Sequence, residues 1–140
     1  MNTEEALLIH LTVQDRRSPL EAYRFIQESL RFAQEELDLG ADDEPEGATS
    51  VGESPVERHL TGQEFCDAIR VFALEQYGYL AKTVLNRLAL HSTSDFGNLV
   101  YNLIDIGLMR KSRRDRREHF DDVYDFEEAF RRDYVFDIPE

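Results

Sequence analysis

Residues 94–107 carry the clearest helical pattern in the chain, and this stretch constrains the fold class most. Large apolar side chains recur there at intervals of three and four residues; they are Phe96, Leu99, Val100, Leu103 and Ile104. This spacing places them on one face of an α-helix. The opposite face carries Asn98, Asn102 and Asp105. We therefore expect a short helix with one buried side.

The ends of this helix also have sequence signals. Thr93 or Ser94 fits the N-cap position, where a side-chain oxygen accepts a bond from an unpaired backbone N–H. Asp95 suits the positive end of the helix dipole, and Gly107 suits the left-handed residue that ends a helix.

Two helices are expected before residue 38. Residues 6–13 fit either a helix or an alternating strand, and the polar start at residues 3–5 favours a helix. Residues 18–21 then read as a capping box with Pro19 as the first helical residue. The second helix should run to about Leu37 with one apolar stripe, formed by Tyr23, Ile26, Leu30, Ala33 and Leu37 and widened by Phe25 and Phe32.

The composition changes abruptly over residues 38–57. This stretch has three glycines, two prolines, no basic residue and few large apolar side chains. Such a segment buries too little apolar surface to offset its ordering entropy. We interpret it as a flexible acidic linker, with a specific acidic docking segment as the alternative.

Residues 58–140 predict a helical core. Thr61 and Glu64 form a capping box for a helix that ends at Tyr77 and Gly78. Its inward face should consist of Phe65, Ala68, Ile69, Phe72 and Ala73. A second helix should occupy residues 79–88 and direct inwards Leu80, Val84, Leu85 and Leu88. The helix at 94–107 is the third.

The segment after these three helices suggests a hairpin. Residues 108–111 read as a short strand, a charged loop follows, and residues 120–124 read as a return strand, although Asp121 and Asp122 also fit an irregular segment. Three helices and a hairpin resemble a winged helix. Asp125 then caps a short helix to about Arg132, and residues 134–138 form an extended tail.

Composition sets the class of the protein. With 140 residues and 41% apolar content, the chain suits a single, mainly α domain. Within residues 1–140 we expect N-terminal helices at 1–37, the linker at 38–57 and the winged-helix-like core at 58–140. The net charge of −13 disfavours contact with nucleic acid or anionic membranes and favours partner proteins with basic patches.

The cellular location follows from features that the chain lacks. The single cysteine permits no internal disulfide, the N-terminus has no basic region of a signal peptide, and no apolar run approaches a membrane span. We expect a cytoplasmic protein without membrane association.

Several short motifs, in order along nearly the whole chain outside the linker, resemble one family. They are Glu21-Ala22-Tyr23 with Phe25, His59 before Thr61-Gly62-Gln63-Glu64, Tyr77-Gly78, Asp95-Phe96-Gly97, Gly107-Leu108 and Tyr124-Asp125-Phe126-Glu127. The chain resembles a small family of uncharacterised proteins restricted to Planctomycetes and Verrucomicrobia. The resemblance implies a bacterial protein and brings no reaction, cofactor or site with it.

No set of residues predicts catalysis or a metal. The four histidines are scattered singly, and only His119 has carboxylates nearby, at Glu118, Asp121 and Asp122; a solvated loop explains this group better than a metal or acid–base site. His59 suits a role in holding the helix entrance. Cys66 lies near a helix start without a recognisable base or oxyanion site, which favours a packed thiol. We expect no enzyme activity, no metal and no cofactor.

The one sharp charge feature lies at residues 110–118. Six basic and two acidic residues give this segment a net charge of +4, whereas the other residues sum to −17. The candidate contact residues are Arg110, Lys111, Arg113, Arg114, Arg116 and Arg117. We predict a small interaction module that binds another protein; the alternative is a nucleic-acid-binding regulator that uses the basic loop at 110–117. Pairing of this loop with the protein's own acids is a third explanation of its charge.

Overall fold

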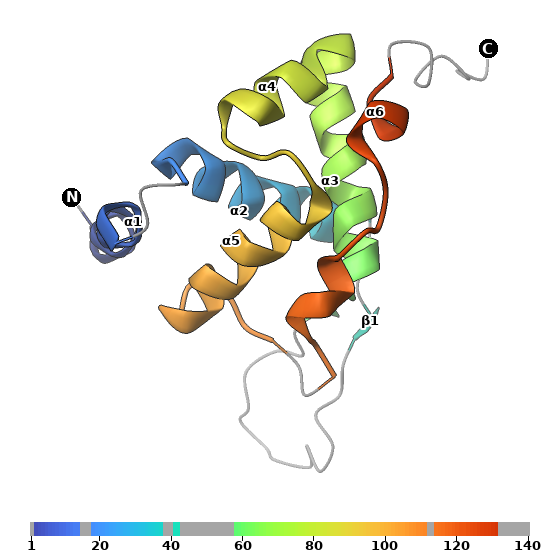
Figure 1. Cartoon of the computed structure of the whole chain (residues 1–140). Helices are drawn as coiled ribbons and strands as arrows, with labels where there is room; N and C mark the ends of the chain where they lie inside the picture. The colour runs from blue at the N-terminus through green and yellow to red at the C-terminus, as the bar shows by residue number, and fades with distance from the viewer. Residues whose placement is uncertain (1, 15–17, 38–40, 43–57, 112–113, 132–140) are drawn as a thin grey trace.

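The computed structural model describes residues 2–14, 18–37, 41–42, 58–111 and 114–131, and this part of the chain is mainly helical. The elements are, in order, α1 (Thr3–Gln14), α2 (Leu20–Glu35), β1 (Ala41–Asp42), β2 (Arg58–His59), α3 (Gly62–Tyr77), the 3-10 helix η1 (Gly78–Leu80), α4 (Ala81–Arg87), α5 (Thr93–Asp105), the 3-10 helix η2 (Arg117–Phe120) and α6 (Phe126–Ala129). Figure 1 shows α1 at one side of the molecule, and η2 and α6 along α3 at the other side.

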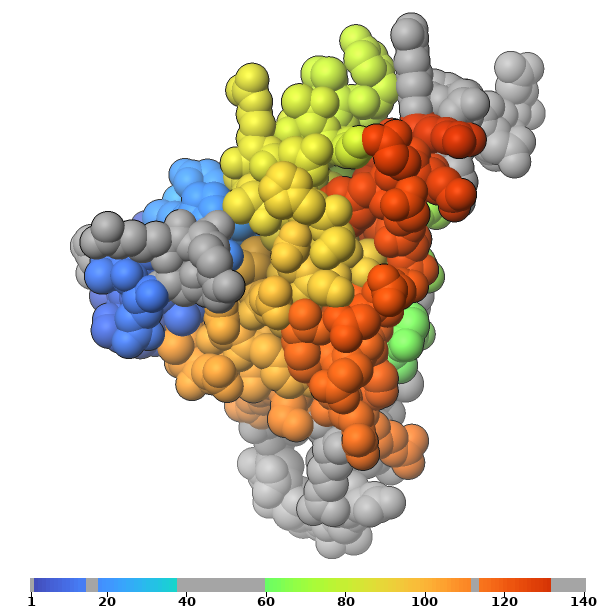
Figure 2. Space-filling model, viewed as in Figure 1, coloured from blue at the N-terminus to red at the C-terminus, as the bar shows by residue number. Residues whose placement is uncertain are grey.

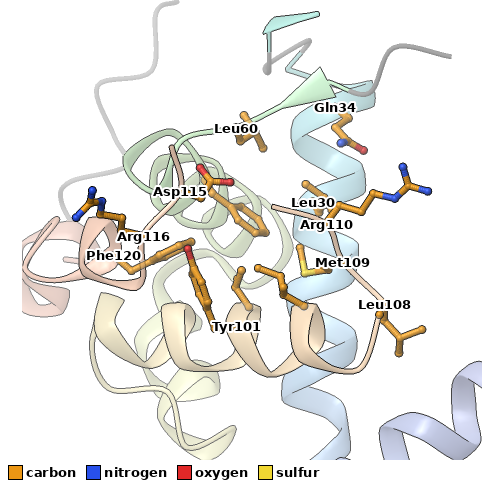
Figure 3. A pocket seen from close by; sticks show the side chains of 15 residues that line it. Leu30, Gln34, Leu60, Tyr101, Leu108, Met109, Arg110, Asp115, Arg116 and Phe120 are labelled. Atoms are coloured by element: carbon orange, nitrogen blue, oxygen red, sulfur yellow. The ribbon is translucent and has the colours of Figure 1, made fainter. Parts of the chain in front are cut away.

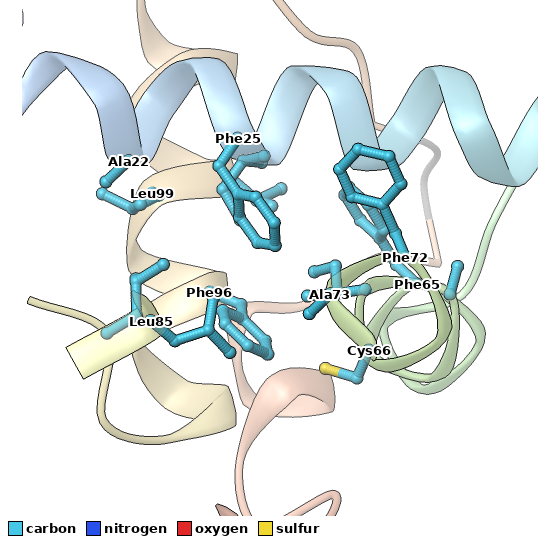
Figure 4. Close-up of a cluster of buried hydrophobic side chains, with 14 of the residues drawn as sticks. Ala22, Phe25, Phe65, Cys66, Phe72, Ala73, Leu85, Phe96 and Leu99 are labelled. Atoms are coloured by element: carbon cyan, nitrogen blue, oxygen red, sulfur yellow. The ribbon is translucent and has the colours of Figure 1, made fainter. Parts of the chain in front are cut away.

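The core forms where α2, α3 and α5 meet. Figure 4 shows Phe25 of α2 and Phe72 of α3 facing each other, with Phe96 of α5 nearby. The ring centroids of Phe25 and Phe72 lie 5.6 Å apart, and those of Phe32 and Phe72 lie 5.1 Å apart. Such tilted aromatic pairs stabilise a core beyond the burial of their area.

The predicted inward faces of the main helices are largely confirmed. All five expected residues of α3 are buried, and on α5 only Ile104 keeps partial exposure. Of the stripe expected on the second helix, Leu30 and Leu37 are partly buried and the rest is buried, although α2 ends at Glu35 and Leu37 lies beyond it. In the helix after η1 the prediction was wrong for Leu80, which is 50% exposed, because α4 begins at Ala81, two residues after the expected start at residue 79, and Ala81 faces the core instead.

Helix ends agree with the sequence in part. The capping box of α3 is confirmed: the Glu64 N–H donates to Thr61 Oγ1, and the Thr61 N–H donates to Glu64 Oε1, both at 3.0 Å. The expected box at Ser18 is absent, since Pro19 is the N-cap of α2 and no side chain caps it.

The start of α5 also differs from the prediction. Ser92 is its N-cap, without a side-chain bond, so Thr93 and Ser94 lie inside the helix. The Thr93 hydroxyl is buried and accepts a bond from the Val123 N–H at 3.1 Å.

The far end of α5 is confirmed. Gly107 has a φ of +82°, a conformation that glycine adopts without the usual side-chain penalty. The Leu108 N–H donates to the Leu103 carbonyl at 2.9 Å, and the Gly107 N–H donates to the Ile104 carbonyl at 3.0 Å. These two bonds form a Schellman motif, which ends α5 and turns the chain back.

The segment from residue 114 to 131 lies across α3 and α5 and appears in Figure 2 as a red band beside α5. Two helical glycines permit this close approach. A Cβ at Gly97 would lie 2.6 Å from the Cβ of Phe120, and a Cβ at Gly62 would lie 2.8 Å from the Cβ of His119. Both contacts are closer than side chains tolerate, so glycine is required where η2 crosses the helices.

The expected β-hairpin is not supported. Residues 108–111 and 114–124 contain no strand; residues 117–120 form η2 instead. Asp122 has a φ of +50°, which is incompatible with an extended return strand. Without the hairpin, the winged-helix-like core is not supported either, and the coarser prediction of a mainly α fold stands.

The remaining expectations have mixed outcomes. Residues 3–14 form α1, which confirms the helix over the strand. Asp125 caps α6 as expected, by accepting a bond from the Glu128 N–H at 3.2 Å, although this helix ends at Ala129. Most of the expected linker and the tail at 134–138 lie outside the described residues. The described part of the linker, Ala41–Asp42, pairs antiparallel with Arg58–His59.

Candidate functional site

The basic segment lies on the surface between α5 and η2. Of the six candidate residues, Arg110, Lys111, Arg114 and Arg116 are exposed, and Arg117 is half-buried. Arg113 lies outside the described residues. Four of the five described candidate side chains therefore lie at the surface.

Arg117 has a structural role. Its Nε donates to Asn98 Oδ1 at 2.7 Å, and its Nη1 donates to Asp121 Oδ1 at 2.5 Å. The same carboxylate oxygen accepts a bond from Ser94 Oγ at 2.7 Å. These hydrogen bonds from Arg117 and Ser94 lower the pKa of Asp121. The cluster ties η2 to the first half of α5.

A groove of about 600 Å³ opens beside the basic segment. Its lining comes from α2, the start of α3, the second half of α5 and the chain on both sides of residues 112–113. The apolar lining consists of Leu30, Leu60, Phe65, Val100, Ile104, Leu108, Met109 and Phe120, and the other lining residues are Gln34, Gly62, Tyr101, Gly107, Arg110, Asp115 and Arg116.

The groove has an apolar floor and a charged rim. Leu30, Ile104 and Met109 remain partly exposed, which leaves apolar surface for an occupant to cover. Figure 3 shows Arg110 and Arg116 on opposite sides of the groove, with their side chains directed away from each other. Two of the six candidate residues thus belong to the rim of one groove.

Tyr101 stands in the wall of the groove (Figure 3). Its ring meets Phe120 edge-on, with centroids 6.5 Å apart. Its hydroxyl oxygen is enclosed, and no described residue forms a hydrogen bond with it. Burial, together with the nearby carboxylates of Asp115 and Glu118, raises the pKa of Tyr101.

The other titratable candidates do not converge. Cys66 is fully buried in α3, and burial raises the pKa of its thiol, as expected for a packed cysteine. Its carbonyl oxygen accepts a bond from the Tyr124 hydroxyl at 2.8 Å. Across the described part of the chain, no group of three or more His, Cys, Asp or Glu side chains could hold a metal ion. The structure describes the backbone of His59 in β2 but not its side chain.

The candidate residues from the sequence include Arg110 and Arg116 at the rim of the groove, but the sequence did not indicate that its apolar lining residues come together. Leu60, Met109 and Phe120 are separated by 49 and 11 residues along the chain, and no local period connects them. The one available signal was the run Gly107-Leu108-Met109, in which two apolar residues follow a helix stop and precede the basic segment.

Comparisons with family models, curated proteins and solved structures found no match to this chain. The resemblance to the planctomycete and verrucomicrobial family therefore stays a prediction. Among the described residues, none of the helices has the length and apolar character needed to cross a membrane.

Proposed function

We propose that this protein is a small, non-enzymatic interaction module of the bacterial cytoplasm, and that its groove binds a short apolar segment of a partner protein. The observation that carries the proposal is the apolar floor of the groove, which lies beside the basic segment and is partly exposed. Covering apolar surface is the main favourable contribution in most protein–protein association.

The groove is built to keep its shape. Phe65, Val100 and Phe120 are buried and belong to three different elements. The approach of Phe120 to Gly97 and the hydrogen bonds of Arg117 to Asn98 and Asp121 fix one wall. A preformed wall lowers the ordering cost of binding.

An elongated occupant suits the groove better than a compact one. The two rim arginines lie on opposite sides (Figure 3), so an occupant must cross the groove to meet both. A peptide segment does this while its apolar side chains cover the floor between them.

Nucleic-acid binding by the basic loop is the alternative. Against it, Arg117 is engaged by Asn98 and Asp121, and the exposed residues of α5 include Asn98 and Asp105 but no lysine or arginine. A helix that contacts phosphate normally brings cationic residues.

The test is a display selection of random peptides against the full-length protein, followed by fluorescence-anisotropy titration of a selected peptide. Met109→Ser removes a floor side chain, and Leu80→Ser is the matched control because Leu80 is exposed and does not line the groove. We expect Met109→Ser to weaken binding by about tenfold, in line with partial loss of a buried Met contact, and Leu80→Ser to leave it unchanged. Leu108→Ser serves as a second floor variant.

Equal loss of affinity in the floor variants and the Leu80 control would overturn the proposal, as would a selection that yields no peptide. Random duplex and single-stranded oligonucleotides are titrated in parallel at low and moderate salt. Steeply salt-dependent binding that is abolished when arginines 113, 114, 116 and 117 become alanine would establish the alternative instead.

A further inference from the structure

We infer that the partner segment carries acidic side chains on both sides of its apolar residues, and that these pair with Arg110 and Arg116. The inference rests on the proposed function and specifies the chemistry of the occupant. An acidic partner segment differs from the partners with basic patches that the sequence suggests. The sequence expectation used the negative net charge of the whole chain, whereas the rim of the groove is positively charged.

The rim provides the local charge. Arg110 directly follows the floor residue Met109, and Arg116 lies four residues before Phe120. Both arginines are exposed, whereas Asp115 in the same lining is partly buried. An arginine presents two parallel N–H donors to a carboxylate, which gives the pair geometric as well as charge selectivity.

The charge of the rest of the molecule sharpens this selectivity. Residues 110–118 sum to +4 and all other residues to −17. Charges act over about 8 Å at physiological salt, so an acidic peptide is attracted at the rim and repelled over most of the remaining surface. A basic peptide would instead be drawn away from the groove. An acidic flank therefore adds affinity to an apolar segment at this site.

The geometry sets the order of residues in the partner. Since the arginines stand on opposite sides and the apolar floor lies between them (Figure 3), the apolar residues of the segment occupy its middle and the carboxylates its two ends.

The experiment uses the full-length protein and three forms of one floor-dependent peptide, with the same apolar centre and with acidic, amide or basic side chains at both ends. We expect the acidic form to bind at least about fivefold more tightly than the amide form. The basic form should bind most weakly. Added salt should reduce the preference for the acidic form.

Substitutions of the rim arginines test which side chains cause the preference for the acidic peptide. Arg110→Gln and Arg116→Gln should each weaken the acidic form by about threefold to tenfold and leave the amide form unchanged. Lys111→Gln is the matched control, because it removes one positive charge from an exposed neighbour that does not line the groove. Arg110→Glu should bring the affinity of the basic form closer to that of the acidic form.

The two proposals fail in different ways. If the amide and acidic forms bind equally and both still need Met109, the inference is wrong and the proposed function stands. If Lys111→Gln costs as much as the arginine variants, the attraction is a diffuse field effect and the specific pairing is wrong. If none of the three forms depends on Met109, the proposed function itself is lost.

Discussion

Gly97→Ala tests how the segment after α5 is held. The substitution adds a Cβ at a position 2.6 Å from the Cβ of Phe120 and 2.9 Å from its Cγ. The Cβ of Phe120 is bonded to the backbone and its Cγ belongs to a buried ring, so neither atom can move without a shift of the backbone or of the ring. The chain must shift locally, and such overpacking costs roughly 1–3 kcal/mol.

Helix propensity acts in the opposite direction. Alanine is more favourable than glycine by about 1 kcal/mol within a helix, and Gly97 lies in the first half of α5. The net expectation is destabilisation by about 1 kcal/mol, with an upper end near 2 kcal/mol. Helix propensity alone would predict stabilisation by about 1 kcal/mol. The sign of the measured change in the free energy of unfolding therefore distinguishes overpacking from helix propensity.

The assay is equilibrium unfolding in guanidinium chloride, followed by far-UV circular dichroism. The matched control compares Asp67→Ala with Asp67→Gly, because Asp67 is exposed inside α3 and reports the alanine–glycine difference without a contact. We expect the midpoint to fall for Gly97→Ala at an unchanged slope. In the control pair, the midpoint of Asp67→Ala should exceed that of Asp67→Gly. If Gly97→Ala raises the midpoint by the same amount, the close contact with Phe120 is refuted.

Three further predictions follow from single positions. Ala89 has a φ of +64° at the end of α4, so Ala89→Gly should stabilise the protein by about 0.5–1 kcal/mol in the same unfolding assay; a lower midpoint would contradict this. Tyr101→Phe removes an enclosed hydroxyl without a described partner and should raise the thermal midpoint slightly, by the equivalent of up to about 1 kcal/mol, whereas a clear loss would reveal a partner. Burial raises the pKa of Cys66 and of Tyr124 in the folded state, so the unfolded chain releases protons first and stability should fall as the pH rises above about 8.5. Urea unfolding at increasing pH should show this fall, with Cys66→Ala and Tyr124→Phe each making it shallower; a pH-independent midpoint would contradict it.

The inward faces of α3 and α5 could be predicted because they depend on local periodicity. A buried helix face repeats every three or four residues whatever it packs against, and Phe65, Ile69, Phe96 and Leu103 are buried as expected. Leu80 shows the limit of this reasoning. The 3-10 helix Gly78–Leu80 moves the start of α4 two residues beyond the expected start at residue 79, so Leu80 lies outside the α-helix.

The segment after α5 could not be predicted from local pattern. Phe120, Val123 and Tyr124 suggest a return strand and Asp121 and Asp122 an irregular segment, but the decisive contact of Phe120 is with Gly97 on a helix that precedes it. Nothing in the neighbouring sequence predicts that position 97 must be glycine. Helix propensity alone would disfavour glycine there. Only the packing of η2 explains it.

The groove is a consequence of the same two features. Gly107 ends α5 and turns the chain so that Leu108 and Met109 line the groove together with Leu30 of α2, whereas Phe120 returns to α5 next to Gly97. The space over the second half of α5 between Met109 and Phe120 is the groove. A shift of Phe120 in Gly97→Ala therefore moves one wall of the binding site without changing any rim charge. Such a variant should lose affinity equally for acidic and amide peptides, a pattern that separates the shape of the groove from the charge of its rim.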